Sequence, residues 1–165
     1  MKNIFFIILL FFTINSYGQF ILSPDEWTTI TDTSVFDGIS RAALVIGTSD
    51  DQYTGSPMIS INRTDDEDIK VILAYWPSSI CETSMLYVNF DNESEIHIIK
   101  ATYSIYTKRY IVRFNPNANN MNIKIFIEKL KTCKMLHMRL SNACGVFINV
   151  DFTLEGAFEA LKILN

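Results

Sequence analysis

Two histidines are the side chains of this sequence best suited to acid–base chemistry near neutral pH. His97 and His137 each lie in a segment where apolar and polar residues alternate, on the opposite phase to their apolar neighbours. That phase is typical of a solvent-facing position in a strand. Neither histidine belongs to a nucleophile elbow, an HExxH pair or a Cys-His signature. We therefore assign no catalytic residue, and keep a small hydrolase that uses His97 or His137 with a turn carboxylate as an alternative.

An aromatic and basic cluster surrounds the turn expected near residue 107. It comprises Tyr103, Tyr106, Lys108, Arg109 and Tyr110. Tyrosine combines a flat apolar ring with a polar tip, which suits contact with a protein surface or a sugar. Tyrosine is also a common strand former, so a half-buried strand pair is the alternative. These five residues form the candidate binding surface.

Residues 65–68 (DDED) concentrate carboxylates in one turn, and clustered carboxylates are the ligands that calcium prefers. The segment lacks the alternating acidic spacing and the glycine of an EF-hand loop. A solvated turn is therefore favoured. The sequence predicts neither a metal site nor a bound cofactor.

Alternating apolar residues near the C-terminus predict a β-hairpin. Its strands are residues 134–140 and 145–152, joined by residues 141–144. In that pairing Leu140 lies opposite about Gly145. The apolar members of both strands are expected to face inward.

The chain has three cysteines, Cys81, Cys133 and Cys144, and an odd number permits at most one internal bridge with one thiol left over. The predicted hairpin separates Cys133 from Cys144 by ~20 Å or more. A disulfide requires Cα atoms within about 7 Å of each other. An internal bridge is therefore expected to join Cys81 to Cys133 or to Cys144, and three free thiols remain the alternative.

The first residues have the features of a secretory leader. Lys2 provides a positive end, and residues 4–12 form an apolar run too short to span a bilayer as a helix. Ser16 and Gly18 place small residues at the −3 and −1 positions of a cleavage site. We expect a periplasmic or secreted mature protein with no stable membrane anchor.

Removal of residues 1–18 as a signal peptide leaves residues 19–165, a length that suits a single domain. The whole chain has a formal net charge of −4. A general nucleic-acid binder needs a basic face to displace counterions. The composition therefore excludes nucleic acid as the expected partner.

Short runs of β-branched and aromatic residues between turn residues predict a mainly β protein. Apolar residues spaced at i, i+3, i+4 and i+7 predict a helix at residues 122–131, with Asn122 as its N-cap, and a second helix at 154–164. Together these elements indicate an antiparallel β-sandwich of about nine short strands with two short helices. The expected strands are residues 27–32, 41–46, 58–62, 69–76, 85–90, 96–105, 109–114, 134–140 and 145–152.

The order of elements resembles the VasI/TagO-like family of small secreted proteins associated with type VI secretion. The matching segments are Trp27, residues 34–46 (SVFDGISRAALVI), 57–76, 89–91, 134–140 (KMLHMRL), 146–152 (VFINVDF) and 154–161 (LEGAFEAL). The resemblance implies a compartment and an architecture, and no defined chemistry.

The leading functional expectation is a non-enzymatic protein that binds a protein partner of the cell envelope. A small envelope hydrolase and a carbohydrate-binding module are the alternatives. A cleft with a histidine beside a carboxylate would favour the enzyme, and a flat exposed aromatic row would favour the sugar-binding module. An exposed apolar sheet face or edge would favour a protein partner.

Export is open to a direct test. The apolar run followed by Ser16 and Gly18 implies that residues 1–18 are removed. Intact-mass measurement on the exported protein should show a chain that begins at Gln19 or within a few residues of it. Retention of the whole apolar segment would contradict the assignment of a cleaved leader.

Overall fold

The computed structural model describes most of the expected domain. The described residues are 25–34, 38–50, 56–64, 69–74, 83–91, 93–104, 109–115, 121–142 and 147–165. Several features expected from the sequence lie outside them: the leader, the acidic turn, Tyr106, Lys108, Cys81 and Cys144.

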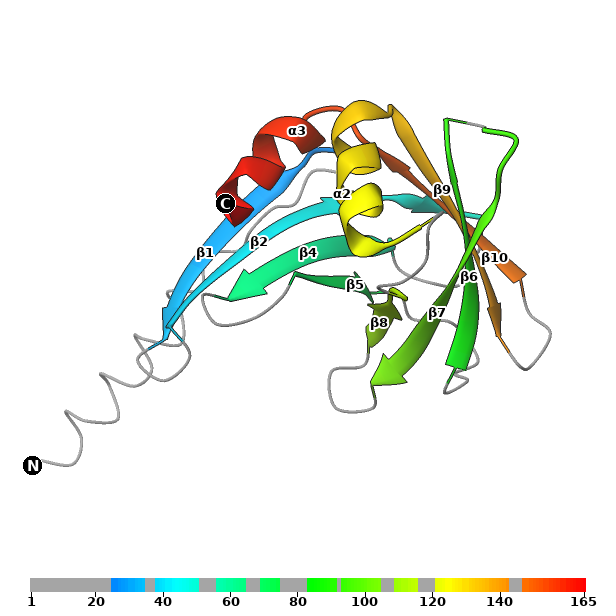
Figure 1. The fold of residues 1–165 in the computed structure, drawn as a ribbon, viewed down its shortest axis with the longest axis horizontal. Coiled ribbons are helices and arrows are strands. Elements are labelled where there is room, and N and C mark those ends of the chain that lie inside the picture. The colour runs from blue at the N-terminus through cyan, green and yellow to red at the C-terminus, as the bar shows by residue number, and fades with distance from the viewer. Residues whose placement is uncertain are drawn as a thin grey trace, which may run out of the picture.

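The described residues form ten strands, two short helices and a final 3-10 turn (Figure 1). The strands are β1 (Thr28–Ser34), β2 (Gly38–Ile46), β3 (Thr48–Ser49), β4 (Met58–Thr64), β5 (Lys70–Ala74), β6 (Thr83–Phe90), β7 (His97–Ser104), β8 (Arg109–Arg113), β9 (Met135–Asn142) and β10 (Phe147–Thr153). The helical elements are α2 (Ile123–Thr132), α3 (Ala157–Ala160) and η1 (Leu161–Leu164).

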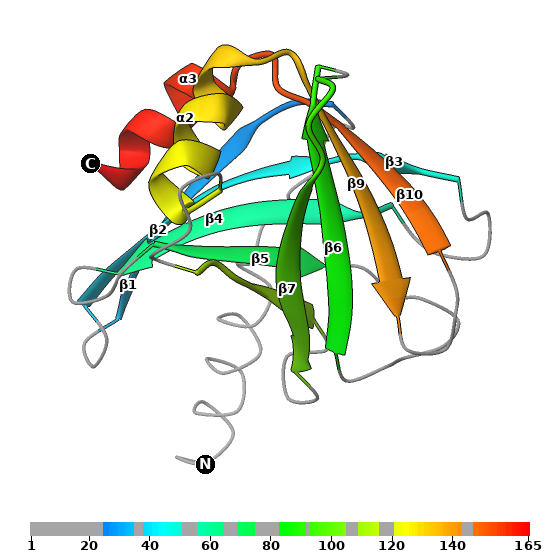
Figure 2. The same ribbon diagram turned by 45° about the vertical axis from the view of Figure 1, so that its right-hand side comes forward.

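All ten strands belong to one antiparallel sheet, in the order β1-β2-β4-β5-β8-β7-β6-β9-β10-β3. The predicted mainly β, antiparallel class is confirmed. The predicted separation into two stacked sheets is not found, because β5 pairs with β8 and joins the two halves. The sheet bends, so that β2, β4 and β5 cross β6, β9 and β10 steeply and both halves face one interior (Figure 2).

A single segment links both ends of the strand order. β2 pairs with β1 and β4, and after Gly47 the chain continues as β3, which pairs with β10. A Cβ atom at Gly47 would collide with the carbonyl oxygen of Asp151 and would lie 2.6 Å from Cδ1 of Phe152. Only glycine allows the backbones to approach this closely.

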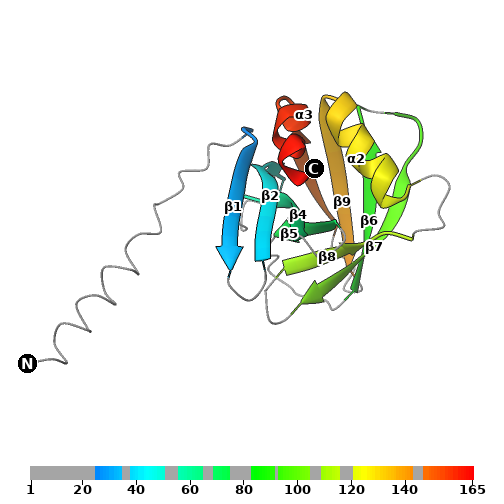
Figure 3. The ribbon, with the colours of Figure 1, turned by 60° about the vertical axis from the view of Figure 1, so that its left-hand side comes forward.

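The helices close one end of the interior (Figure 3). The predicted helix α2 and its N-cap are confirmed, since Asn122 Oδ1 accepts from the Ile125 N–H at 3.0 Å. The apolar stripe of α2 is buried, and the Phe126 ring packs 5.7 Å from that of Phe90 and 5.0 Å from that of Phe114, centre to centre. The expected final helix is divided into α3 and η1, after a start at Gly156 with φ of 85°.

The predicted hairpin of β9 and β10 is confirmed, and so is its alternation. Leu136, Met138 and Leu140 are buried, as are the alternate residues of β10. The register differs from the prediction, because Leu140 pairs with Ile148 rather than with a residue near Gly145. β9 continues to Asn142, two residues beyond its predicted end, and Ser141 of the predicted turn pairs with Phe147.

Asp91 fixes the start of β9 against the end of β6. Its Oδ1 accepts hydrogen bonds from the backbone N–H groups of Lys134 and Met135, both at 2.8 Å. The Met135 bond lowers the pKa of Asp91 below its ordinary value; the Lys134 bond acts in the same direction, and desolvation acts against both. Asp91 has a φ of 49°, in the region where Asp and Asn are tolerated better than alanine.

Replacement of this carboxylate should reduce stability in a pH-dependent way. Asp91→Ala removes two accepted hydrogen bonds and is expected to cost about 1 kcal/mol at pH 7. Because the pKa of Asp91 is lower in the folded chain, its stabilisation is present above the unfolded pKa and is lost as the pH falls through the folded one, below about pH 4.

Urea unfolding of the wild type, Asp91→Ala and Asp91→Asn at pH 7 and at pH 3 measures both effects. The Asn variant keeps an acceptor and tolerates the positive φ, but it has no carboxylate to titrate. Its free energy of unfolding should therefore approach that of the wild type at pH 3. Equal stability of wild type and Asp91→Ala at pH 7 would contradict the role of Asp91.

Candidate functional site

Strand alternation places a lattice of polar side chains on the outer face of β6, β9 and β10. The side chains in this lattice alternate with buried residues of the same strands. The register aligns them in two rows across the strands: Tyr87, Arg139 and Asn149 in one, and Asn89, His137 and Asp151 in the other.

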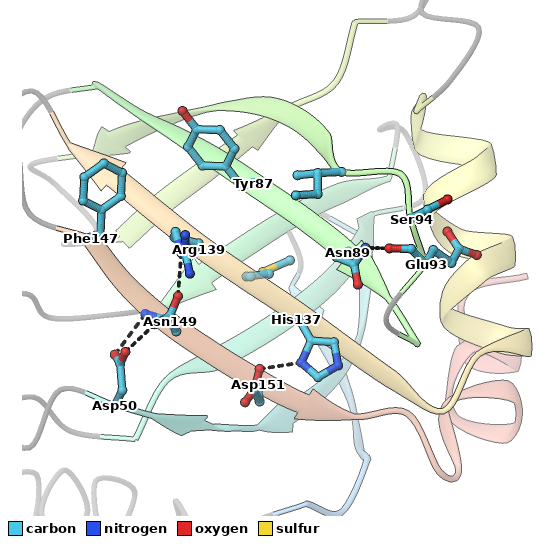
Figure 4. Close-up of a pocket in the computed structure, with 12 residues that line it drawn as sticks. Asp50, Tyr87, Asn89, Glu93, Ser94, His137, Arg139, Phe147, Asn149 and Asp151 are labelled. Carbon is cyan, nitrogen blue, oxygen red and sulfur yellow. Dashed lines mark hydrogen bonds and ion pairs between the residues drawn. The ribbon is translucent and has the colours of Figure 1, made fainter.

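These rows form the floor of a hollow of about 920 Å³ (Figure 4). One wall is the connection from β6 to β7, which contributes Glu93, Ser94 and Ile96. Asp50, which follows β3, and Phe147, at the start of β10, also line the hollow. Asn89 of the floor supports this wall, because its Nδ2 donates to the carbonyl oxygens of Glu93 at 2.7 Å and Glu95 at 3.0 Å.

His137 and Asp151 are joined by a hydrogen bond at one end of the hollow. Their Nδ1 and Oδ1 atoms are 2.7 Å apart. The predicted outward phase of His137 is confirmed. A carboxylate that orients a histidine is a feature of a general base. However, the remaining Nε2 of His137 is buried and has no hydrogen-bond partner in the described part of the chain, so it contacts no nucleophile there.

In the other row of the floor, hydrogen bonds connect Arg139, Asn149 and Asp50. Arg139 Nε donates to Asn149 Oδ1 at 2.7 Å. Asp50 Oδ1 accepts from the Asn149 backbone N–H at 2.9 Å, while Oδ2 accepts from Nδ2. Asp50 is 99 residues from Asn149 along the chain, and no local pattern indicated that the two would meet.

Exposed apolar side chains gather around this lattice. Among the residues that the structure describes, five large apolar ones are exposed: Met85, Ile96, Ile98, Phe147 and Phe158. All except Phe158 lie on or beside the outer face of β7, β6, β9 and β10. Ile98 lies directly opposite Tyr87, and Met85 is two residues before Tyr87 on β6. The face therefore combines a polar centre with an apolar surround.

The prediction that His97 faces solvent is wrong. Its side chain is only 2% exposed, and neither ring nitrogen has a hydrogen-bond partner among the described residues. Nδ1 lies 3.5 Å from the Glu95 carboxylate. Ile99 and Ala101, on the same phase as His97, face the interior, whereas Ile98 is exposed. Because β7 has apolar residues at both alternating sets of positions, the sequence pattern did not indicate which set faces the interior.

Tyr103 and Tyr110 of the expected aromatic patch turn toward the interior instead of forming an exposed row. Tyr110 is buried, and its ring packs edge-on against that of the half-buried Tyr103, with centroids 5.1 Å apart. Both rings belong to or pack against the interior cluster. For this pair the alternative of a half-buried strand pair is correct. Arg109 starts β8 opposite Ser104.

Cys133 is a free, half-buried thiol, and burial raises its pKa. The expected pairing of Cys81 with Cys133 is therefore not formed. A bridge between Cys81 and Cys144 stays a prediction. The described residues contain no cluster of His, Cys, Asp or Glu positioned to hold a metal ion.

Comparison with models of protein families, with curated proteins and with solved structures gave no match. The geometry of the face must therefore support any functional conclusion by itself. No helix in the described ranges is both long and apolar enough to cross a membrane.

The burial of His97 generates a test of its structural role. Two desolvated nitrogens that have no hydrogen-bond partner among the described residues oppose folding. His97→Leu should therefore unfold at an equal or higher urea concentration than the wild type, with a gain of up to about 1 kcal/mol. His97→Gln keeps a polar group at the site and serves as the matched control without that gain. A loss of more than about 1 kcal/mol in His97→Leu would mean that His97 has a stabilising partner.

Proposed function

We propose that this chain is an exported, non-enzymatic protein that binds a protein partner through the outer face of β7, β6, β9 and β10. The observation that carries the proposal is the gathering of Met85, Ile96, Ile98 and Phe147 on that face. Soluble proteins rarely expose contiguous apolar surface unless it contacts another molecule. Tyr87 and Arg139 lie at its centre, and these residue types are enriched among the contacts that dominate binding energy.

A binding role fits the hollow better than hydrolysis does. A catalytic His137 would have to take a proton at Nε2, but that atom is buried and contacts no hydroxyl or thiol of the described chain. Met85 and Ile98 are exposed although neither lines the hollow. The apolar contact surface therefore extends beyond a small-molecule site, which favours a protein over a free sugar.

The compartment of this function follows from the sequence. The leader-like residues 1–18 support export, and a periplasmic or secreted protein would meet its partner at the cell envelope. The resemblance to the VasI/TagO-like family supports a partner associated with a secretion system.

Site-specific photo-crosslinking tests the assigned face. A benzoyl-phenylalanine at position 98 should give a discrete crosslinked product with envelope extract from the producing cell, and the same residue at position 158 should not. Phe158 is the matched control, because it is about as exposed as Ile98, at 53% against 56%, but lies outside this face.

Competition with unlabelled protein makes the result specific. Excess wild-type protein should remove the product at position 98, whereas excess Ile98→Asp protein should compete poorly. Phe158→Asp should compete as well as the wild type, because Phe158 is exposed but lies outside this face. Equal labelling at positions 98 and 158 would reject the assignment of this face.

A further inference from the structure

We propose that Arg139 anchors the partner by binding the side-chain carboxylate of an acidic residue in the docked segment. The inference rests on the protein-binding function proposed above and names what the partner presents. Arg139 is exposed, and its Nε is used by Asn149. No acceptor among the described residues is assigned to Nη1 and Nη2. A planar guanidinium can bind both oxygens of one carboxylate through these two nitrogens.

The guanidinium is held in place before a partner arrives. Asp50 accepts from both the backbone N–H and the Nδ2 of Asn149, which leaves Asn149 Oδ1 directed at Arg139 (Figure 4). An arginine fixed in this way loses less side-chain freedom on binding. Asn149 is therefore a positioning residue, and Asp50 fixes the orientation of its amide.

The other charged groups of the hollow already have partners. Asp151 is paired with His137, and Glu93 is paired with Lys129 at 2.6 Å. Among the charged side chains that line the hollow, the free end of Arg139 is thus the one with hydrogen-bond donors left unused by the described residues. The carboxylates of Asp50, Glu93 and Asp151 repel an anion elsewhere in the hollow. A bound carboxylate must therefore contact the Arg139 guanidinium directly.

The arrangement around Arg139 favours an internal acidic residue over a chain terminus. Tyr87 lies directly across from Arg139 on β6, and Phe147 lies on β10 two residues before Asn149, the residue opposite Arg139. Figure 4 shows both rings near Arg139, on the two strands that flank β9. Apolar surface therefore continues on both sides of the carboxylate position. The partner segment is expected to carry an acidic residue flanked by apolar ones.

A second copy of this chain is a poorer occupant. Two copies related by a two-fold axis would present the same hollow to each other, which would leave both hollows unfilled. A convex segment of a different protein fills the hollow and reaches Arg139.

A matched set of peptides tests the inference by NMR titration of the protein, observed at the Arg139 Nε–Hε cross-peak. The probes are acetyl-Leu-Glu-Phe-amide, the neutral acetyl-Leu-Gln-Phe-amide, and acetyl-Leu-Gln-Phe with a free terminal carboxylate. The Glu peptide should bind about ten-fold or more tightly than either Gln peptide, because only it carries a carboxylate between two apolar side chains.

Variants assign the effect to the proposed groups. Arg139→Gln should remove the preference for the Glu peptide, and Asn149→Ala should reduce it, while both keep the dispersed spectrum of the fold. Arg113→Gln is the control, since Arg113 is an exposed arginine on β8 that does not line the hollow, and it should keep the full preference.

Several results would overturn the inference. These are equal affinity for the Glu and neutral Gln peptides, absence of binding by both, a preference that persists in Arg139→Gln, or tightest binding by the terminal carboxylate. A shift of the Arg139 cross-peak caused by raising the protein concentration alone would assign the face to a second copy. If the peptide test fails while crosslinking at position 98 remains specific, the role of Arg139 falls and the protein-binding function stands.

Discussion

The close passage of the chain past β10 at Gly47 is the constraint on which the rest of the structure depends. No larger residue fits there, because its Cβ would collide with the Asp151 carbonyl and the Phe152 ring. The passage lets β2 continue into β3, so that one segment pairs with β4 on one side of the interior and with β10 on the other. It also delivers Asp50 to Asn149, and thus orients Arg139.

The candidate site is a consequence of how paired strands alternate. Inward side chains of β6, β9 and β10 form the core, and the outward ones are left in register with their cross-strand neighbours. His137 meets Asp151 and Arg139 meets Asn149 because each pair occupies opposite positions of one ladder. The polar groups therefore stabilise one another without a ligand, and Arg139 retains unused donors.

Local periodicity was enough to predict the helix α2 and the alternation of β9 and β10, since both depend on neighbours in the sequence. It was insufficient for β7, where Ile98 and Ile99 are both apolar and only packing decides which row is buried, so His97 was misplaced. The single sheet depends on the pairing of β5 with β8, and Asp50 depends on a contact across 99 residues. Neither has a local sequence signal.

β3 has only two residues, and we expect it to join β10 late in folding. Its two residues pair with a strand about a hundred positions away, so the pairing must close a very long loop in return for few ladder hydrogen bonds. Contacts of this kind form late and open early, because little energy opposes their local release. The hairpins can therefore stay paired while Asp50 is detached, and Asn149 and Arg139 are fully oriented only when β3 has joined β10.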